Sequence, residues 1–221
     1  MHPRLHRTAA ALLAALLGMA AAHAAVTPEE AARLKTELTP FGAEKAGNKD
    51  GTIPAWTGGY STPIPGDKPG GRRGDPFKDD KPLYSVTAKN VDQHAGKLSD
   101  GVKALLKKYP DSFRLDVYPT RRTAVAPQWV YDNTAKNALR AKLDGHKLVG
   151  AYGGIPFPIP KSGLEAIWNH KLGWRGSAWE ADFNQYQITA NGKVVLTTDG
   201  RIRQRMPYYF DDGSVDSFEG V

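Results

Sequence analysis

The residues from 150 to 176 constrain the fold more than any other part of the chain. Proline occupies positions 156, 158 and 160. Each proline ring fixes its own φ at about −65° and keeps the preceding residue out of the helical region. Residues 155–160 are therefore predicted to be extended, and with so few N–H donors they cannot form a central strand. Gly153 and Gly154, just before this arm, favour a turn.

A short amphipathic helix is predicted directly after the proline-rich arm. Ser162 and Glu165 have the spacing of a capping box, in which the hydroxyl accepts from the backbone of the third residue and the carboxylate reaches back. The apolar residues that follow recur at helical spacing and give one face: Leu164, Ile167, Trp168 and Leu172. A rigid arm joined to such a helix organises packing and is not a catalytic motif.

The same stretch carries a resemblance to a known family. GGIPFPIPKSGLEAIWNH, residues 153–170, resembles the hallmark of DUF1329, a family of bacterial envelope proteins of unknown function, and residues 38–59 resemble the opening of that family. The resemblance implies similarity to outer-membrane lipoprotein-sorting carriers, which have half-open β-barrels over helices. It also implies one DUF1329-like domain over residues 25–221, truncated at its C-terminus, because members of the family are about twice as long.

The first 24 residues have the pattern of a secretion signal. Arg4 and Arg7 lie in a basic start, residues 9–22 are an apolar run, and Ala22-His23-Ala24 matches the cleavage pattern. Cleavage is expected after Ala24. The apolar run is too short to span a bilayer, so no transmembrane segment is expected in the mature chain. The chain contains no cysteine, which excludes a disulfide framework and a lipid-modified cysteine. These features predict a periplasmic protein stabilised by packing alone.

The chain is basic, with a formal net charge of +7. Without Arg4 and Arg7 the excess is 28 basic over 23 acidic residues, or +5. Such a charge suits weak attraction to anionic membrane surfaces or lipid headgroups, and equally suits ordinary solubility. No nucleic-acid-binding motif is present, so no nucleic-acid partner is expected.

Local signals outline the first two thirds of the chain. Thr27 and Ser99 are predicted N-caps of helices, and Thr87 is a third candidate. Residues 58–82 contain so much glycine and proline that no regular element is expected there. Residues 113–118 alternate like a half-buried strand. Residues 128–131 are a second short strand candidate, and residues 134–143 are predicted to be helical.

The last part of the chain has the pattern of antiparallel strands. Strands are predicted over residues 177–189, 193–198 and 201–210, with turns at Asn191-Gly192 and Asp199-Gly200. The apolar alternation changes parity after Phe183, which suggests a bulge and a bend. The expected fold class is α+β: N-terminal helices and long Pro/Gly-rich loops, followed by a curved antiparallel β-meander that is part of an incomplete half-open β-barrel.

No catalytic constellation is visible in the sequence. Ser162 is not in a G-x-S-x-G elbow, and Glu165 and His170 lie on different faces of the predicted helix instead of forming an HExxH zinc pair. Asn48 to Gly51 lacks the alternating acidic ligands of a calcium loop. No catalytic residue, metal or cofactor is therefore predicted.

Three functional hypotheses follow. The first is a non-catalytic periplasmic binding or carrier protein for a lipid or other apolar ligand, with Phe157, Trp168, Trp179 and Phe183 as candidate cavity lining. The second is an envelope interaction protein, accessory to an exporter, whose partner docks on the proline-rich arm. The third, a periplasmic hydrolase, is favoured least, because it lacks a recognisable set of catalytic groups.

Overall fold

The structure is a computed structural model that describes residues 26–64, 66–68, 71 and 74–218. The predicted signal and its cleavage point lie outside the described residues. Two compact units are present. Within the described residues, unit 1 contains residues 26–45 and 126–218, and unit 2 contains residues 46–125. The single domain expected over residues 25–221 stays a prediction.

The described elements are short except for one helix and one hairpin. Unit 1 contains α2 (Pro28–Ala32), η1 (Arg33–Lys35), α5 (Gln128–Arg140), β3 (Lys142–Asp144), β4 (Lys147–Val149), α6 (Gly163–Lys171), β5 (Ala178–Ile188), β6 (Val194–Arg205), η3 (Pro207–Tyr209) and η4 (Val215–Ser217). Unit 2 contains β1 (Tyr84–Val86), α3 (Val91–His94), η2 (Ala95–Lys97), α4 (Asp100–Lys108) and β2 (Leu115–Val117).

The proline-rich arm lies in the interior of unit 1, as its role in packing predicted. Residues 151–158 are all buried. Two of the arm's backbone N–H groups are satisfied by side chains: Ile155 N donates to Thr134 Oγ1 (2.9 Å), and Phe157 N donates to Asn169 Oδ1 (2.8 Å). The arm therefore obtains its hydrogen bonds from neighbouring helices α5 and α6 and needs no partner strand.

A buried amide connects the arm to the C-terminal part of unit 1. Asn137 on α5 is fully enclosed. Its Nδ2 lies 3.2 Å from the carbonyls of Tyr152 and Gly154, and its Oδ1 accepts from Tyr152 N (3.1 Å). The hydroxyl of Tyr208 in turn donates to the Gly154 carbonyl (2.6 Å). A buried amide satisfied on both its oxygen and its nitrogen fixes three separate segments in one arrangement.

The helix α5 corrects the predicted division of this region into a strand over residues 128–131 and a helix over 134–143. One continuous helix runs from Gln128 to Arg140. Val130, Thr134, Asn137 and Ala138 are its buried residues, and they recur at the spacing of one helix face. Packing of that face outweighs the strand propensity of the tryptophan, valine and tyrosine at its start.

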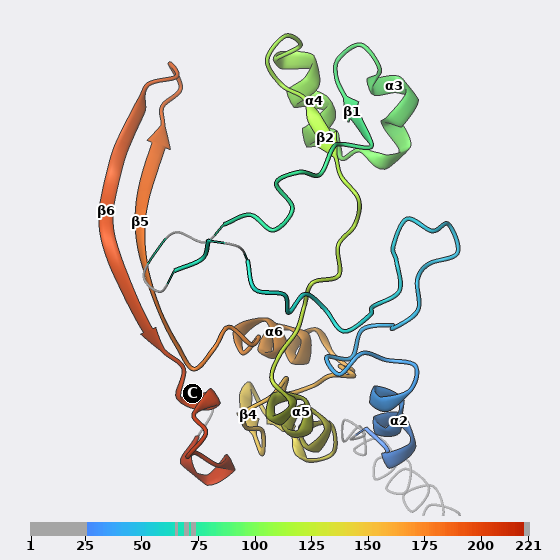
Figure 1. Cartoon of the computed structure of the whole chain (residues 1–221), viewed down its shortest axis with the longest axis vertical. Coiled ribbons are helices and arrows are strands. Elements are labelled where there is room, and N and C mark those ends of the chain that lie inside the picture. The colour runs from blue at the N-terminus through green and yellow to red at the C-terminus, as the bar shows by residue number, and fades with distance from the viewer. Residues whose placement is uncertain (1–25, 65, 69–70, 72–73, 219–221) are drawn as a thin grey trace, which may run out of the picture. The chain divides into compact units, whose positions relative to one another are not determined.

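The residues after α6 form one long curved hairpin, β5–β6 (Figure 1). This corrects the predicted three-stranded meander. Asn191-Gly192 does form the turn, but Asp199-Gly200 lies inside β6, where Gly200 pairs with Phe183. A Cβ at Gly200 would lie 3.4 Å from the Phe183 ring, so the aromatic ring covers the glycine and replaces the packing that it lacks. The predicted irregularity is present between Gln185 and Tyr186.

Unit 2 is built around a two-stranded antiparallel sheet and α4. β1 pairs with β2, with Val86 opposite Leu115. Val86 of this sheet and Leu106 of α4 are the buried apolar residues of the unit. The described residues between 58 and 82 contain no helix or strand, which confirms the prediction made from their glycine and proline content.

Several predicted helix caps are confirmed. Thr27 and Glu30 form a complete capping box, and the Ser99 hydroxyl accepts from Val102 N. The Ser162 hydroxyl accepts from Glu165 N as expected, but the Glu165 carboxylate accepts from Lys161 N and not from the N-cap residue itself. The predicted helix after Thr87 is shorter than expected and begins only at Val91.

The fold class is α+β with an open sheet, as predicted. The described strands form three separate two-stranded antiparallel sheets, and none of them closes on itself. No helix within the described ranges has both the length and the apolar character needed to cross a bilayer.

Candidate functional site

The β5–β6 hairpin exposes apolar side chains on one face of its first half. Strand alternation places Trp179, Ala181 and Phe183 of β5 on the same face, and the register places Ile202 of β6 directly opposite Ala181. We call these four residues the apolar ribbon face. Phe183 is 41% exposed and Ile202 is 40% exposed. Large apolar groups on a two-stranded ribbon are left open to solvent or to a ligand.

The tip of the hairpin is also apolar. Beyond the register shift, Tyr186 pairs with Leu196 and Ile188 pairs with Val194. All four side chains are exposed, Ile188 the most, at 71%. Because alternation continues along β5, these residues belong to the face opposite the apolar ribbon face. Apolar surface therefore changes sides along the hairpin.

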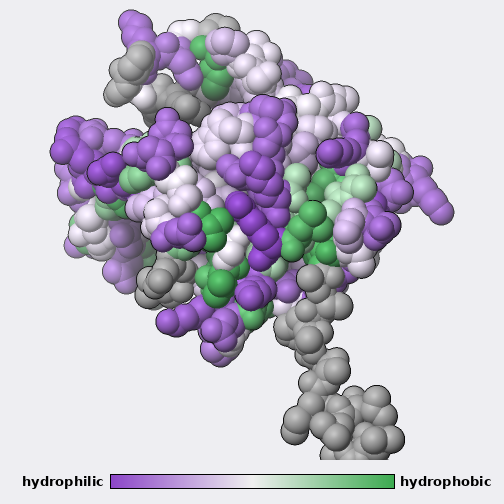
Figure 2. All heavy atoms as spheres, turned by 90° about the horizontal axis from the view of Figure 1, so that it is seen from below, coloured by the Kyte–Doolittle hydropathy of each residue, from purple (hydrophilic) through white to green (hydrophobic). Residues whose placement is uncertain are grey.

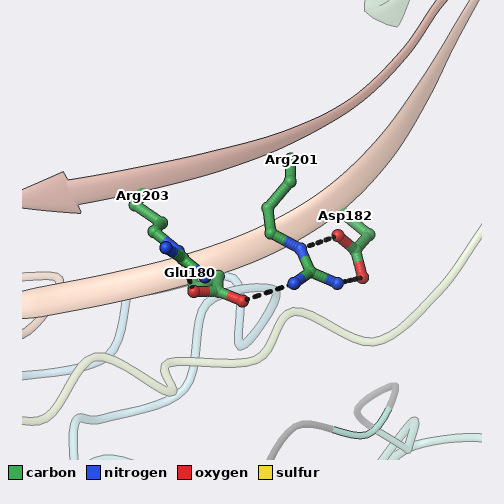
Figure 3. Close-up of polar contacts among 4 residues, drawn as sticks. All are labelled: Glu180, Asp182, Arg201 and Arg203. Carbon is green, nitrogen blue, oxygen red and sulfur yellow. Dashed lines mark hydrogen bonds and ion pairs between the residues drawn. The ribbon is translucent and has the colours of Figure 1, made fainter.

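The charged face lies behind the apolar ribbon face and carries a ladder of ion pairs (Figure 3). Arg201 holds Asp182 through two hydrogen bonds, of 2.6 and 3.2 Å, and its other terminal nitrogen lies 3.5 Å from Glu180. Glu180 also accepts from Arg203 Nε (2.5 Å). The Arg201 guanidinium lowers the pKa of the Asp182 carboxyl. These arginines are neutralised by cross-strand carboxylates, so this face of the hairpin is suited to contact with water.

The four predicted lining residues divide into two pairs. Phe157 and Trp168 lie in the core of unit 1, and the Trp168 indole N–H donates to the His146 carbonyl (3.1 Å). Trp179 and Phe183 lie on the apolar ribbon face. Phe157 and Trp168 thus share one core cluster, whereas Trp179 and Phe183 share a face of β5 but are four residues apart along the strand. As ligand contacts, all four stay predictions.

The residues weighed for catalysis are not gathered into a reactive group. Ser162 serves as the N-cap of α6, and His170 is exposed near the end of that helix. Glu165 is buried and bonded to Lys161 N. Over the part of the chain that the structure describes, no group of three His, Cys, Asp or Glu side chains is placed to hold a metal ion.

A pocket of about 370 Å³ opens in unit 1 between α5 and the segment that follows the hairpin. One wall is formed by Trp129, Asn133 and Arg140 of α5, whose spacing of four and seven residues places them on one helix face. The opposite wall is residues 210–211 and 213–216, and Tyr152 also contributes. This pocket contains none of the four predicted lining residues.

Tyr152 holds the far wall of the pocket in place. Its hydroxyl lies 2.7 Å from the Phe210 carbonyl and 3.0 Å from the Pro207 carbonyl. A Cβ at Gly213 would lie only 1.7 Å from that hydroxyl, so only glycine lets the loop approach so closely. Burial raises the pKa of the Tyr152 hydroxyl above its ordinary value, which keeps it a neutral hydrogen-bond donor.

Sequence reasoning missed this pocket. The division of residues 128–143 into two elements hid the shared helix face of Trp129, Asn133 and Arg140. Reading the region as one helix would have revealed that face. The opposite wall follows the hairpin and lies far along the chain, so no local pattern links the two walls.

Apolar residues do not cover the surface of the protein evenly. On the face shown in Figure 2, apolar residues lie in small separate groups among polar ones. On the hairpin, in contrast, exposed apolar residues lie side by side across the two strands.

Comparison with known proteins assigns the chain to a family. The fold is α+β with an exposed apolar hairpin. The DUF1329 family, described as a protein of unknown function, matches residues 85–220, and the chain belongs to this family.

One curated relative is Uncharacterized protein PA3922 of Pseudomonas aeruginosa, which is 43% identical over 175 residues. The match covers 78% of this chain but only 38% of the relative. The chain thus spans about two fifths of the length of that relative. No solved structure matches the chain.

Proposed function

We propose that the protein is a non-catalytic binding or carrier protein for a lipid or another apolar molecule, and that it works in the bacterial periplasm. The observation that carries this proposal is the exposed apolar surface of the β5–β6 hairpin. None of the residues of β5 or β6 is buried, although Phe183 and Ile202 are large enough to build a core. An apolar ligand that covers them would remove this surface from water.

The energetics of the hairpin favour a ligand or a further layer over it. An isolated two-stranded hairpin is marginally stable in water, and it gains stability when its apolar face is covered. Full burial of a phenylalanine or isoleucine side chain stabilises by about 1.5–3 kcal/mol. The curved ribbon supplies one wall of a ligand cavity, and the cross-strand ion pairs of Arg201 and Arg203 keep its opposite face in water.

The periplasmic location is supported by the signal pattern of residues 1–24 and by the absence of cysteine. The resemblance of the family to lipoprotein-sorting carriers also supports an apolar ligand. Both are arguments from sequence.

The hairpin also favours a second candidate function. Over the described residues, neither outer edge of β5–β6 pairs with a third strand. Such an edge offers free N–H and C=O groups, and a partner protein can add a strand to it. The second candidate is therefore an envelope interaction protein, with an exporter component as the partner. The proline-rich arm is not the docking edge expected from the sequence, because residues 151–158 are buried.

Native mass spectrometry of the protein purified from a bacterial periplasm tests the two candidates together. A compact ion that carries a small apolar adduct supports the carrier. A complex with a second polypeptide and no small adduct supports the interaction protein. A compact ion with neither, together with no binding of a fluorescent fatty acid to the stripped protein, overturns the carrier proposal.

Matched variants locate the ligand on the hairpin. Phe183→Ser combined with Ile202→Ser removes the two exposed large side chains of the apolar ribbon face. Phe183 lies opposite Gly200, and Ile202 lies opposite Ala181. We expect fluorescent fatty acid binding to weaken at least about tenfold, which corresponds to 1.4 kcal/mol. Asp182→Ser combined with Arg201→Ser changes the opposite face at neighbouring positions and should leave binding unchanged. Equal losses in both variants would show that the face is not the binding surface.

A further inference from the structure

The pocket beside α5 contains a cation that has no ionic partner in the part of the chain that the structure describes. Arg140 is half-buried, and its Nε and Nη2 donate to Asn137 Oδ1 (3.0 and 2.9 Å). Nη2 also lies 3.4 Å from the Tyr152 carbonyl. No carboxylate of the described residues forms an ion pair with it. Burial of a charge is costly unless that charge is paired, and burial lowers the pKa of this guanidinium.

The hydrogen bonds of Arg140 fix its orientation. Asn137 is held by the backbone of the arm, so its Oδ1 cannot move to follow the guanidinium. Nε and Nη2 face this fixed acceptor, which leaves Nη1 as the nitrogen without a partner among the described residues. An orienting contact of this kind presents a donor to the pocket in one position and reduces the entropy lost when a ligand binds.

Two carboxylates lie on the other wall of the same pocket. Asp211 and Asp216 are exposed and line the pocket with Arg140. Neither forms an ion pair with Arg140 or with another described cation. A pocket that served only to bury Arg140 would bring a carboxylate into contact with it. Here the opposite charges share one cavity but remain apart.

The wall that carries Arg140 also has aromatic and polar residues. Trp129 lines the pocket and packs edge-on against Trp174, with ring centroids 5.4 Å apart. Asn133 lies next to it on the helix face, and no described residue hydrogen-bonds its side-chain amide. The volume of about 370 Å³ lies at the lower end of the range for small-molecule sites.

We propose that this pocket binds a small zwitterion. The anionic group of the ligand, a carboxylate or a phosphate, binds the free side of Arg140, and the ammonium group binds between Asp211 and Asp216. Trp129 packs against the apolar part of the ligand. The site does not depend on the proposed carrier function, because it shares no residue with the apolar ribbon face.

Two sources provide this chemistry: a free amino acid, or the headgroup of a zwitterionic phospholipid. Isothermal titration of the whole protein with leucine and with phosphoethanolamine distinguishes them. Inorganic phosphate and ethanolamine serve as the two half-ligands. We expect one of the zwitterions to bind at least tenfold more tightly than either half-ligand. Binding of leucine alone indicates an amino-acid site, and binding of phosphoethanolamine alone indicates a headgroup site.

Variants test each end of the pocket. Arg140→Gln keeps a donor for Asn137 but removes the charge, and we expect at least tenfold weaker binding of the zwitterion, as for loss of a charge-assisted hydrogen bond. Arg175→Gln, at an exposed arginine outside the pocket, is the matched control. Asp211→Asn combined with Asp216→Asn should weaken binding of the zwitterion and leave binding of phosphate unchanged. This exposed double variant keeps the test open if Arg140→Gln fails to fold.

The proposal is overturned if the wild-type protein binds neither zwitterion. It is also overturned if Arg140→Gln folds and matches Arg175→Gln in affinity, or if the aspartate double variant binds the zwitterion as the wild type does. Fluorescent fatty acid binding in Arg140→Gln gives an independent readout. It should stay unchanged, so failure of this site and failure of the carrier proposal are distinguishable.

Discussion

The core around α5 and the β5–β6 hairpin belong to the same compact unit but differ in how far their side chains are buried. In the core, Val130, Thr134 and Asn137 are completely enclosed, and the polar members have hydrogen-bond partners. In the hairpin, no residue is buried. The core is complete within the described residues, whereas the hairpin offers surface that another molecule or layer would cover. Buried packing and exposed apolar surface are thus separated into different elements.

Two tryptophans give the sharpest test of this separation. Trp168→Ala leaves a cavity in the core and should lower the free energy of unfolding by about 4 kcal/mol. Trp179→Ala on the hairpin should cost less than about 1 kcal/mol. Urea denaturation followed by far-ultraviolet circular dichroism measures both. Equal losses would show that the hairpin is as much a part of the folding core as α6 is.

Two asparagines repeat the comparison for polar groups. Asn137→Ala leaves the Tyr152 N–H and nearby carbonyls without their partner and should cost about 3 kcal/mol. Asn184→Ala, on the exposed β5 strand, is the matched control and should shift the urea midpoint very little. A stable Asn137→Ala protein would mean that water or a rearranged Tyr208 replaces the amide.

Alkaline pH should act on the core. Burial raises the pKa of Tyr208 and of Tyr209 well above the ordinary value. Because the pKa of each tyrosine is higher in the folded state, its full contribution to the free energy of unfolding is present below the unfolded-state pKa of about 10. That contribution is lost as pH rises above this value. The loss is about 1.4 kcal/mol per pH unit for each ring. Chemical denaturation at pH values from 9 to 12 should show this fall, and a flat profile would contradict it.

Acid pH should act weakly on the hairpin. The Arg201 guanidinium lowers the pKa of the exposed Asp182 carboxyl. The contribution of the Asp182 carboxylate to the free energy of unfolding is therefore present above the ordinary aspartate pKa. It is lost as pH falls through the lowered pKa. Because the pair is exposed, Asp182→Asn should leave the thermal midpoint at neutral pH nearly unchanged. A clear drop would show that the ion-pair ladder supports the fold.

Local chemistry explains which parts of the fold the sequence predicted. The proline-rich arm and the caps at Thr27, Ser99 and Ser162 depend on neighbouring residues, and they were predicted correctly. The continuity of α5 depends on burial of one helix face, and the strand through Asp199-Gly200 depends on cross-strand packing with Phe183. Both outcomes are decided by tertiary contacts that override local propensity.

The candidate sites were predictable to different degrees. Trp179 and Phe183 were recognised from strand alternation, because the hairpin keeps that alternation as far as its register shift. The pocket beside α5 was not recognised, because its two walls meet only in the folded chain. Arg140 has no unusual sequence context. Its distinction is that no carboxylate among the described residues pairs with it, which only the folded structure reveals.

The base of the hairpin is tied by one hydrogen bond, from Met206 N to the Ser177 carbonyl (2.8 Å). The chain therefore leaves the core and returns to it at almost the same point. Residues 178–205 can be lengthened, shortened or exchanged in evolution while the arm, α6 and η3 keep their places.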